Sequence, residues 1–157
     1  MRALFRFFAA LVLAGCQATA PTQPAAPAAA DPSLATLQVW RDADAAFGTR
    51  AADFRVDDVP VFSLQRGARS SIQLAPGTHT LRQAWPSDVS AAALTITLTV
   101  AAGEQRYFSL TTTSASASAA MGARQVQWVL REESEAVAQE SMGTKVYTAP
   151  LVSRLPR

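Results

Sequence analysis

The chain has 157 residues, of which 49% are hydrophobic and 17% charged. It is therefore long enough for one domain with a core, and too apolar to be disordered throughout. Two of the 14 basic residues, Arg2 and Arg6, lie near the N-terminus, so 12 basic residues balance 12 acidic ones from Cys16 onward, which argues against nucleic-acid binding. One cysteine and one histidine exclude an intramolecular disulfide, a zinc site built on cysteines and a pair of catalytic histidines.

Residues 1–15 are typical of a signal peptide. Arg2 and Arg6 make its N-terminal part positive, and an uninterrupted run of apolar or small residues covers 7–15. This run is shorter than the roughly 20 residues that a membrane-spanning helix needs. It ends in Leu13-Ala14-Gly15-Cys16, which resembles the lipobox of bacterial lipoproteins.

The lipobox resemblance implies cleavage before Cys16 and attachment of acyl chains to this residue. Each buried CH₂ group contributes about 0.8 kcal/mol, so two or three chains would hold the protein durably on a membrane. Gln17 in place of aspartate favours the outer membrane of a Gram-negative cell, facing the periplasm. The alternative is an ordinary secretory signal that contains a cysteine.

The stretch after the signal peptide, residues 16–33, is a tether rather than a folded segment. It is rich in alanine and contains Pro21, Pro24, Pro27 and Pro32, which interrupt any helix. It has no apolar period with which to bury a face, so we expect a disordered, partly polyproline linker.

Residues 34–142 are predicted to form one all-β domain. Short alternating segments are separated by turn residues, of which Pro76-Gly77 is the clearest pair, and the cleanest strand is 94–100, with four aliphatic side chains on one face and three threonines on the other. Residues 112–120 lack large apolar side chains and are predicted to form a loop, whereas 131–141 are helix-prone, with Gly143 as their end. The tail 143–157 is undetermined, apart from a possible edge strand over 145–149. The fold prediction is a small β-sandwich of about seven strands with a short C-terminal helix; a small open barrel is the alternative.

The order of these segments resembles one family of bacterial lipoproteins. They are an alternating strand that ends in Arg41, a strand into the Asp57-Asp58 turn, a Gly67-led strand, a Pro-Gly turn before His79, and a strand that leads through Gly103 to Tyr107-Phe108. Over residues 37–130 this order is similar to the family known as domain of unknown function (DUF) 2846, which more often has glycine in place of Asp58. The resemblance implies a sandwich in an envelope lipoprotein and supplies no reaction.

The residues provide no catalytic set and no metal site. His79 follows a turn, where its ring is expected to cap a backbone group, and no serine lies in a nucleophile-elbow context. Asp42 with Asp44, and Asp57 with Asp58, lack the spaced oxygen ligands of a calcium loop and are interpreted as solvated turn acids. No cofactor is expected.

Three tryptophans are candidates for either packing or binding. Trp128 alternates with aliphatic residues and is predicted to lie in the core. Trp40 and Trp85 are the candidate contacts for a ligand or partner, because exposed aromatic rings stack on sugars and on proteins; packing under the helix or tail is the alternative.

Three functions follow from these patterns. The first is a non-enzymatic, membrane-anchored envelope lipoprotein whose sandwich serves as a binding or adaptor module for other envelope proteins. The second is a carbohydrate-binding module for peptidoglycan or another glycan. The third, a hydrolase using His79, has the least support.

Overall fold

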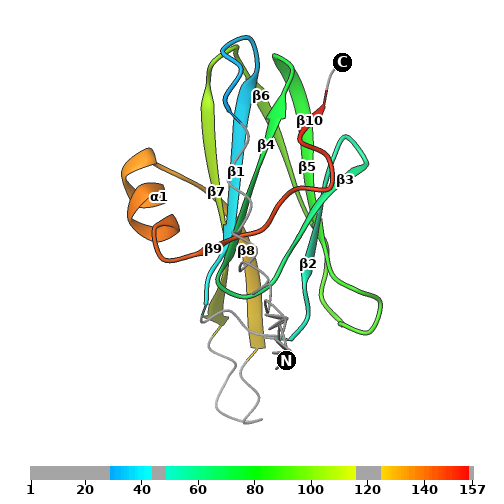
Figure 1. Ribbon diagram of the computed structural model, residues 1–157. Coiled ribbons are helices and arrows are strands. Elements are labelled where there is room, and N and C mark those ends of the chain that lie inside the picture. Colours follow the sequence, from blue (N-terminus) through cyan, green and yellow to red (C-terminus); the bar gives the residue numbers. More distant parts are fainter. Residues whose placement is uncertain (1–28, 44–48, 116–124, 156–157) are drawn as a thin grey trace, which may run out of the picture.

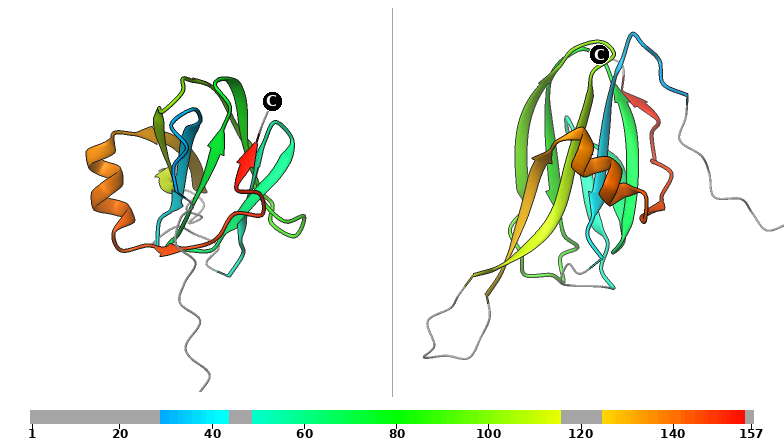
Figure 2. Two further views of the ribbon diagram at one scale, coloured as in Figure 1. Left: turned by 45° about the horizontal axis from the view of Figure 1, so that its top comes forward. Right: turned by 90° about the vertical axis from the view of Figure 1, so that its left-hand side faces the viewer.

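The computed structural model describes residues 29–43, 49–115 and 125–155, which form ten strands and one helix. The strands make two sheets that pack face to face (Figures 1 and 2). The predicted all-β sandwich with a C-terminal helix is confirmed, and the open barrel of the alternative is not formed. The signal peptide, Cys16 and most of the tether lie outside the described residues.

The larger sheet contains the strands that later form the candidate site. Its order is β10-β4-β1-β7-β8, with β9 also paired to β4. The neighbours β1 and β7 run parallel, whereas β4 and β8 run antiparallel to them. The strands are β1 (Ala35–Arg41), β4 (Ala68–Leu74), β7 (Gln105–Ala115), β8 (Gln125–Glu133), β9 (Val146–Tyr147) and β10 (Arg154–Leu155).

The smaller sheet is antiparallel throughout and has the order β3-β2-β5-β6. On β6 the predicted separation of aliphatic residues and threonines onto opposite faces is confirmed. Thr95, Thr97 and Thr99 are exposed, while the aliphatic residues face the other sheet. The strands are β2 (Ala52–Val56), β3 (Val59–Leu64), β5 (Gly77–Ala84) and β6 (Leu94–Val100).

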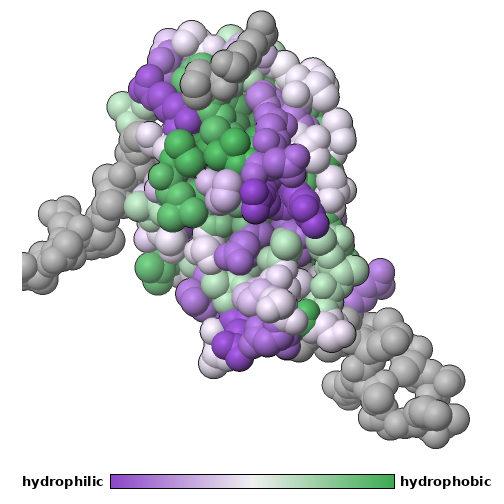
Figure 3. All heavy atoms as spheres, turned by 90° about the vertical axis from the view of Figure 1, so that its right-hand side faces the viewer, coloured by the Kyte–Doolittle hydropathy of each residue, from purple (hydrophilic) through white to green (hydrophobic). Residues whose placement is uncertain are grey.

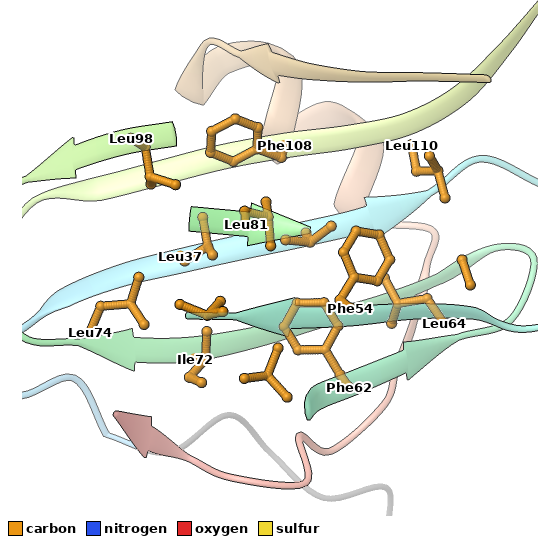
Figure 4. Close-up of a cluster of buried hydrophobic side chains, with 14 of the residues drawn as sticks. Leu37, Phe54, Phe62, Leu64, Ile72, Leu74, Leu81, Leu98, Phe108 and Leu110 are labelled. Atoms are coloured by element: carbon orange, nitrogen blue, oxygen red, sulfur yellow. The ribbon is translucent and has the colours of Figure 1, made fainter. Parts of the chain in front are cut away.

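The core lies between the two sheets (Figure 4). Alternate residues of each strand point into it, as the period of two in the sequence requires. The rings of Phe54 and Phe62 meet there with their centroids 5.1 Å apart. Further buried members shown in the figure are Leu37, Leu64, Ile72, Leu74, Leu81, Leu98, Phe108 and Leu110.

The turn between β2 and β3 consists of Asp57 and Asp58. Both residues have positive φ, 49° and 64°, as a two-residue primed hairpin turn demands. Aspartate tolerates this conformation better than most residues other than glycine and asparagine. The chain therefore makes a tight turn although Asp58 is not glycine.

The tail after the helix forms part of the sandwich and accounts for two of the ten strands. In β9, Val146 and Tyr147 pair with the start of β4, and β10 pairs with its end. Between them, the Leu151 N–H donates to the carbonyl of Val61 in β3, so the tail touches both sheets. Figure 3 shows apolar atoms gathered on one face of the molecule. Val59 of β3 and Leu151 of the tail are among the exposed large hydrophobic residues.

Helix α1 (Glu135–Met142) begins later than predicted. Residues Arg131 to Glu133 continue β8, because they pair with β7 and Glu132 binds Arg106. Ser134 is the N-cap, and its hydroxyl accepts from the Val137 N–H at 3.4 Å. Ala138 and Met142 pack on the outer side of the larger sheet, where Figure 2 shows α1. Val137 of the same helix is 42% exposed.

The predicted loop over 112–120 also needs correction. Residues Thr112 to Ala115 belong to β7 and pair with β8. β-Branched threonines suit a paired strand even without a large apolar side chain. Residues 116–120 lie outside the described part of the chain.

Candidate functional site

A groove lies on the outer face of the larger sheet, where the tether joins β1. Its volume is about 440 Å³, within the range of roughly 300–1,000 Å³ that is usual for small-molecule sites. Strands β1, β4 and β7 form its floor, and the tail and Ala30 form its walls. The lining residues are Ala30, Thr36, Gln38, Ser71, Ile72, Gln73, Gln105, Tyr147, Ala149, Pro150 and Ser153.

Strand register brings the polar floor together from three distant segments. Thr36 pairs with Gln73 on one side and with Gln105 on the other. Two residues further along β1, on the same face, Gln38 pairs with Ser71. Because alternate residues share a face, these side chains form two rows on the face opposite the core.

The side chains of the floor form a network of neutral hydrogen bonds. The Gln38 amide donates to Oε1 of Gln105 at 3.2 Å, and the Tyr107 hydroxyl donates to the same oxygen at 2.9 Å. The hydroxyls of Ser71 and Tyr147 lie 3.4 Å apart. None of the described residues that line the groove is charged, so the site suits a neutral ligand.

Gln73 connects the groove to the end of the tether. Its Nε2 donates to the carbonyl of Ala29 at 3.0 Å, and its side chain is buried, with 4% exposed. Its Oε1 is buried and has no hydrogen-bond partner among the described residues. Such an oxygen costs free energy unless a ligand or a water molecule donates to it.

A cation–π contact flanks one end of the groove, and an ion pair flanks the other. At one end the guanidinium of Arg69 lies 5.5 Å from the ring centroid of Tyr147. At the other end Arg154 pairs with Asp31 at 3.4 Å. The hydrogen bonds that Ser33 donates, together with the charge of Arg154, keep the pKa of Asp31 below its usual range despite the opposing effect of burial.

The structure corrects the prediction that Trp40 and Trp85 offer exposed faces to a ligand or partner. Trp40 is 1% exposed, because α1 covers it with Ala138 and Met142. Trp85 is 9% exposed and lies in the core, with its ring centroid 4.4 Å from that of Trp128. Packing under the helix therefore accounts for Trp40, whereas Trp85 packs in the core and not under the helix or tail. The predicted core position of Trp128 is confirmed.

Arg41 is a buried residue whose role the sequence did not reveal. Its guanidinium lies 5.0 Å from the ring centroid of Trp85 and 5.4 Å from that of Trp128, and it donates to the carbonyls of Arg50 and Leu64. Burial lowers the pKa of Arg41, and the charge of Arg66 adds to this effect. Its place on the inner face of β1 gives it a structural role at one end of the core.

The side chain of His79 contacts two turns. Its Nδ1 lies 2.6 Å from Oδ2 of Asp57 and its Nε2 lies 2.7 Å from the carbonyl oxygen of Ala75, while the ring is 8% exposed. The expected capping of a backbone group is confirmed. With Nε2 bound to a carbonyl, neither ring nitrogen is available as a base for a serine.

Of the other candidate acids, Asp42 has a basic partner in the tail and Asp44 lies outside the described residues. Asp42 pairs with Lys145 at 3.6 Å. Within 29–43, 49–115 and 125–155, no three metal-ligating side chains come together. In the same ranges, no helix has the length and hydropathy to cross a membrane.

No family model matches the chain, and the comparison with curated proteins found no match. The resemblance to the DUF 2846 lipoproteins therefore stays a prediction. The amide-lined groove was missed because it depends on strand register. Its only signal in the sequence was one glutamine in each of two predicted strands, Gln38 in 37–41 and Gln73 in 72–74, each between apolar neighbours.

Proposed function

We propose that this protein is a non-enzymatic lipoprotein of the cell envelope whose sandwich binds another envelope component through the groove. The observation that carries this proposal is the position of the groove. Ala30 lines it and Gln73 holds Ala29, so the binding surface begins where the tether ends. A ligand there would lie close to the point at which the domain is held.

The proposed anchor is Cys16, acylated after cleavage at Leu13-Ala14-Gly15. The charge balance from Cys16 onward disfavours a nucleic-acid partner, and Gln17 favours the outer membrane with the domain in the periplasm. The proline-rich tether would let the domain reach a partner clear of the lipid headgroups.

The hydrogen-bond partners of His79 support a binding role rather than a catalytic one. Its two ring nitrogens face the Asp57 carboxylate and the Ala75 carbonyl, which leaves no proton acceptor for a reacting group. The groove is lined by amides, hydroxyls and apolar side chains, which orient a neutral ligand without supplying a nucleophile–base pair.

The anchor is tested by fractionating bacterial cells that express the full chain or Cys16→Ala. We expect the full chain in the membrane fraction, with acyl chains on Cys16 in its mass spectrum, and Cys16→Ala in the soluble fraction or unprocessed. A full chain that is soluble with an unmodified thiol would contradict the anchor and favour the ordinary secretory signal.

The binding surface is tested by placing a photo-crosslinking residue at Ser153, in the wall of the groove. Thr97, exposed on the outer face of the smaller sheet, is the matched control position. We expect adducts in intact cells from position 153 that are absent from position 97. Equal adducts from both positions would contradict a role for the groove.

A further inference from the structure

The groove combines neutral hydrogen-bonding side chains with a small apolar wall. Gln38, Gln73 and Gln105 each carry an amide with donors and an acceptor, and Tyr147 and Pro150 of the tail add apolar surface. This pairing of amides with an aromatic ring matches a sugar, whose hydroxyls lie around the rim of the ring and whose C–H groups lie on its faces.

We propose that the groove binds a neutral oligosaccharide. This inference rests on the proposed function and names the ligand class of the same site. A charged ligand would meet opposite charge only at the ends of the groove, where Arg69 and the Arg154–Asp31 pair lie, and none among the described lining residues of the floor and walls. It would lose its hydration along the rest of the groove, so an uncharged glycan is favoured.

The unpartnered oxygen of Gln73 supports a ligand rich in hydroxyl or N–H donors. Its Nε2 is already engaged with Ala29, so the amide orientation is set and Oε1 remains as an acceptor on the groove side chain. Because this oxygen is buried, a small shift of the side chain on binding would bring it to a sugar hydroxyl or acetamide N–H, which would satisfy it.

A peptide strand fits the surface less well. Strands β9 and β10 pair with the two ends of the β4 edge, at residues 68–69 and 73–74, and both edges of β1 are paired. Only the short middle of the β4 edge is left for a peptide, so the floor presents mainly side chains. Peptides that add to sheets need such a free edge.

The test is a titration of the ¹⁵N-labelled full chain, in detergent, followed by NMR of the glutamine side-chain amides. The probes are the neutral tetramers of N-acetylglucosamine and of cellulose, an acidic galacturonate tetramer, and a peptide with the sequence of residues 17–28. We expect a neutral tetramer to shift Gln38, Gln73 and Gln105 saturably. The core residue Gln83 and the exposed Gln127 of β8 are internal references.

Two variants and one control locate the binding. Gln38→Ala removes an amide that donates to Gln105, and we expect about ten-fold weaker binding. Ser153→Trp fills the groove from the exposed tail and should abolish binding. Gln127→Ala, the same change outside the groove, should leave the affinity unchanged, and the remaining backbone spectrum reports whether each variant is folded.

Several outcomes overturn the proposal. They are no shift of the groove amides with either neutral tetramer, equal binding of the acidic tetramer, or binding that Gln38→Ala and Ser153→Trp leave intact. Shifts caused by the 17–28 peptide alone would assign the groove to the protein's own tether. The proposed anchor is tested separately by membrane fractionation, and the result of that experiment does not depend on sugar binding.

Discussion

The imidazole of His79 joins two turns that are 18 residues apart in the chain, since it lies between the Asp57 carboxylate, 2.6 Å from Nδ1, and the Ala75 carbonyl, 2.7 Å from Nε2. The Thr80 N–H donates to the other oxygen of Asp57 at 2.8 Å. This contact fixes the β2–β3 turn against the start of β5.

The pKa of Asp57 predicts a loss of stability in acid. Burial acts to raise this pKa, but the hydrogen bonds from His79 and Thr80, with the charge of His79, bring it below its ordinary value of 3.8. The stabilisation is therefore present above pH 3.8 and is lost as the pH falls through the lower value in the folded state. In urea unfolding at a series of pH values, Asp57→Asn should be less stable than the parent at neutral pH, and the difference should shrink in acid. Asp58→Asn, in the same turn, is the control; an equal pH dependence in both variants would contradict the assignment.

Two matched glycine variants in the β2–β3 turn separate the backbone strain of the turn from the contact with His79. Asp58→Gly removes a side chain from a residue with φ of 64°, so we expect it to leave stability unchanged or raise it by up to about 1 kcal/mol. Asp57→Gly relieves the same backbone conformation but removes the carboxylate that binds His79 and Thr80. It should therefore be the less stable of the two in thermal unfolding; the opposite order would show that the His79 contact contributes little.

Arg41 is expected to stabilise the core through packing and cation–π contact. Arg41→Ala removes the guanidinium that contacts both Trp85 and Trp128. It also leaves the Arg50 and Leu64 carbonyls without this donor, so we expect a cost of about 2–4 kcal/mol. Chemical denaturation followed by tryptophan fluorescence measures this change. Arg82→Ala, on the exposed face of β5, should change stability by less than about 0.5 kcal/mol. Similar losses in the two variants would contradict the role of Arg41.

Helix α1 is expected to depend on Met142 for its contact with the sheet. Met142→Ala should destabilise the protein by about 2 kcal/mol and move the fluorescence of Trp40 toward that of a solvated ring, because Met142 and Ala138 cover it. Val137→Ala changes an exposed residue of the same helix and should have little effect on either quantity. Unchanged fluorescence in Met142→Ala would mean that Trp40 is shielded without this side chain.

The tail protects an edge of the larger sheet. Deletion of residues 144–157 should uncover β4 and promote association between copies, because unpaired strand edges recruit other strands. Light scattering after size-exclusion chromatography would show dimers or larger species at concentrations where the full chain is monodisperse. Deletion of 156–157 alone keeps β9 and β10 and is the control; a monomeric 144–157 deletion would contradict the protective role.

The fold was predictable from local pattern, whereas the groove was not. Alternation identified the strand over Leu94 to Val100, and the Pro76-Gly77 pair marked a turn, because both signals depend on residues close together in the chain. The groove requires Thr36 to lie between Gln73 and Gln105, and only the pairing of β1 with β4 and β7 brings these three together. A shift by one residue would turn the amides into the core.

The sequence by itself determined that this chain contains an all-β domain and where its strands alternate, since a buried face with a period of two leaves a local trace. Only the tertiary structure decided which aromatic rings are covered. Trp40 has the outward position of a surface ring, yet α1, about 95 residues later in the chain, packs over it. Burial of a side chain depends on what packs against it, and for Trp40 and Trp85 those neighbours come from elements that local pattern does not bring together.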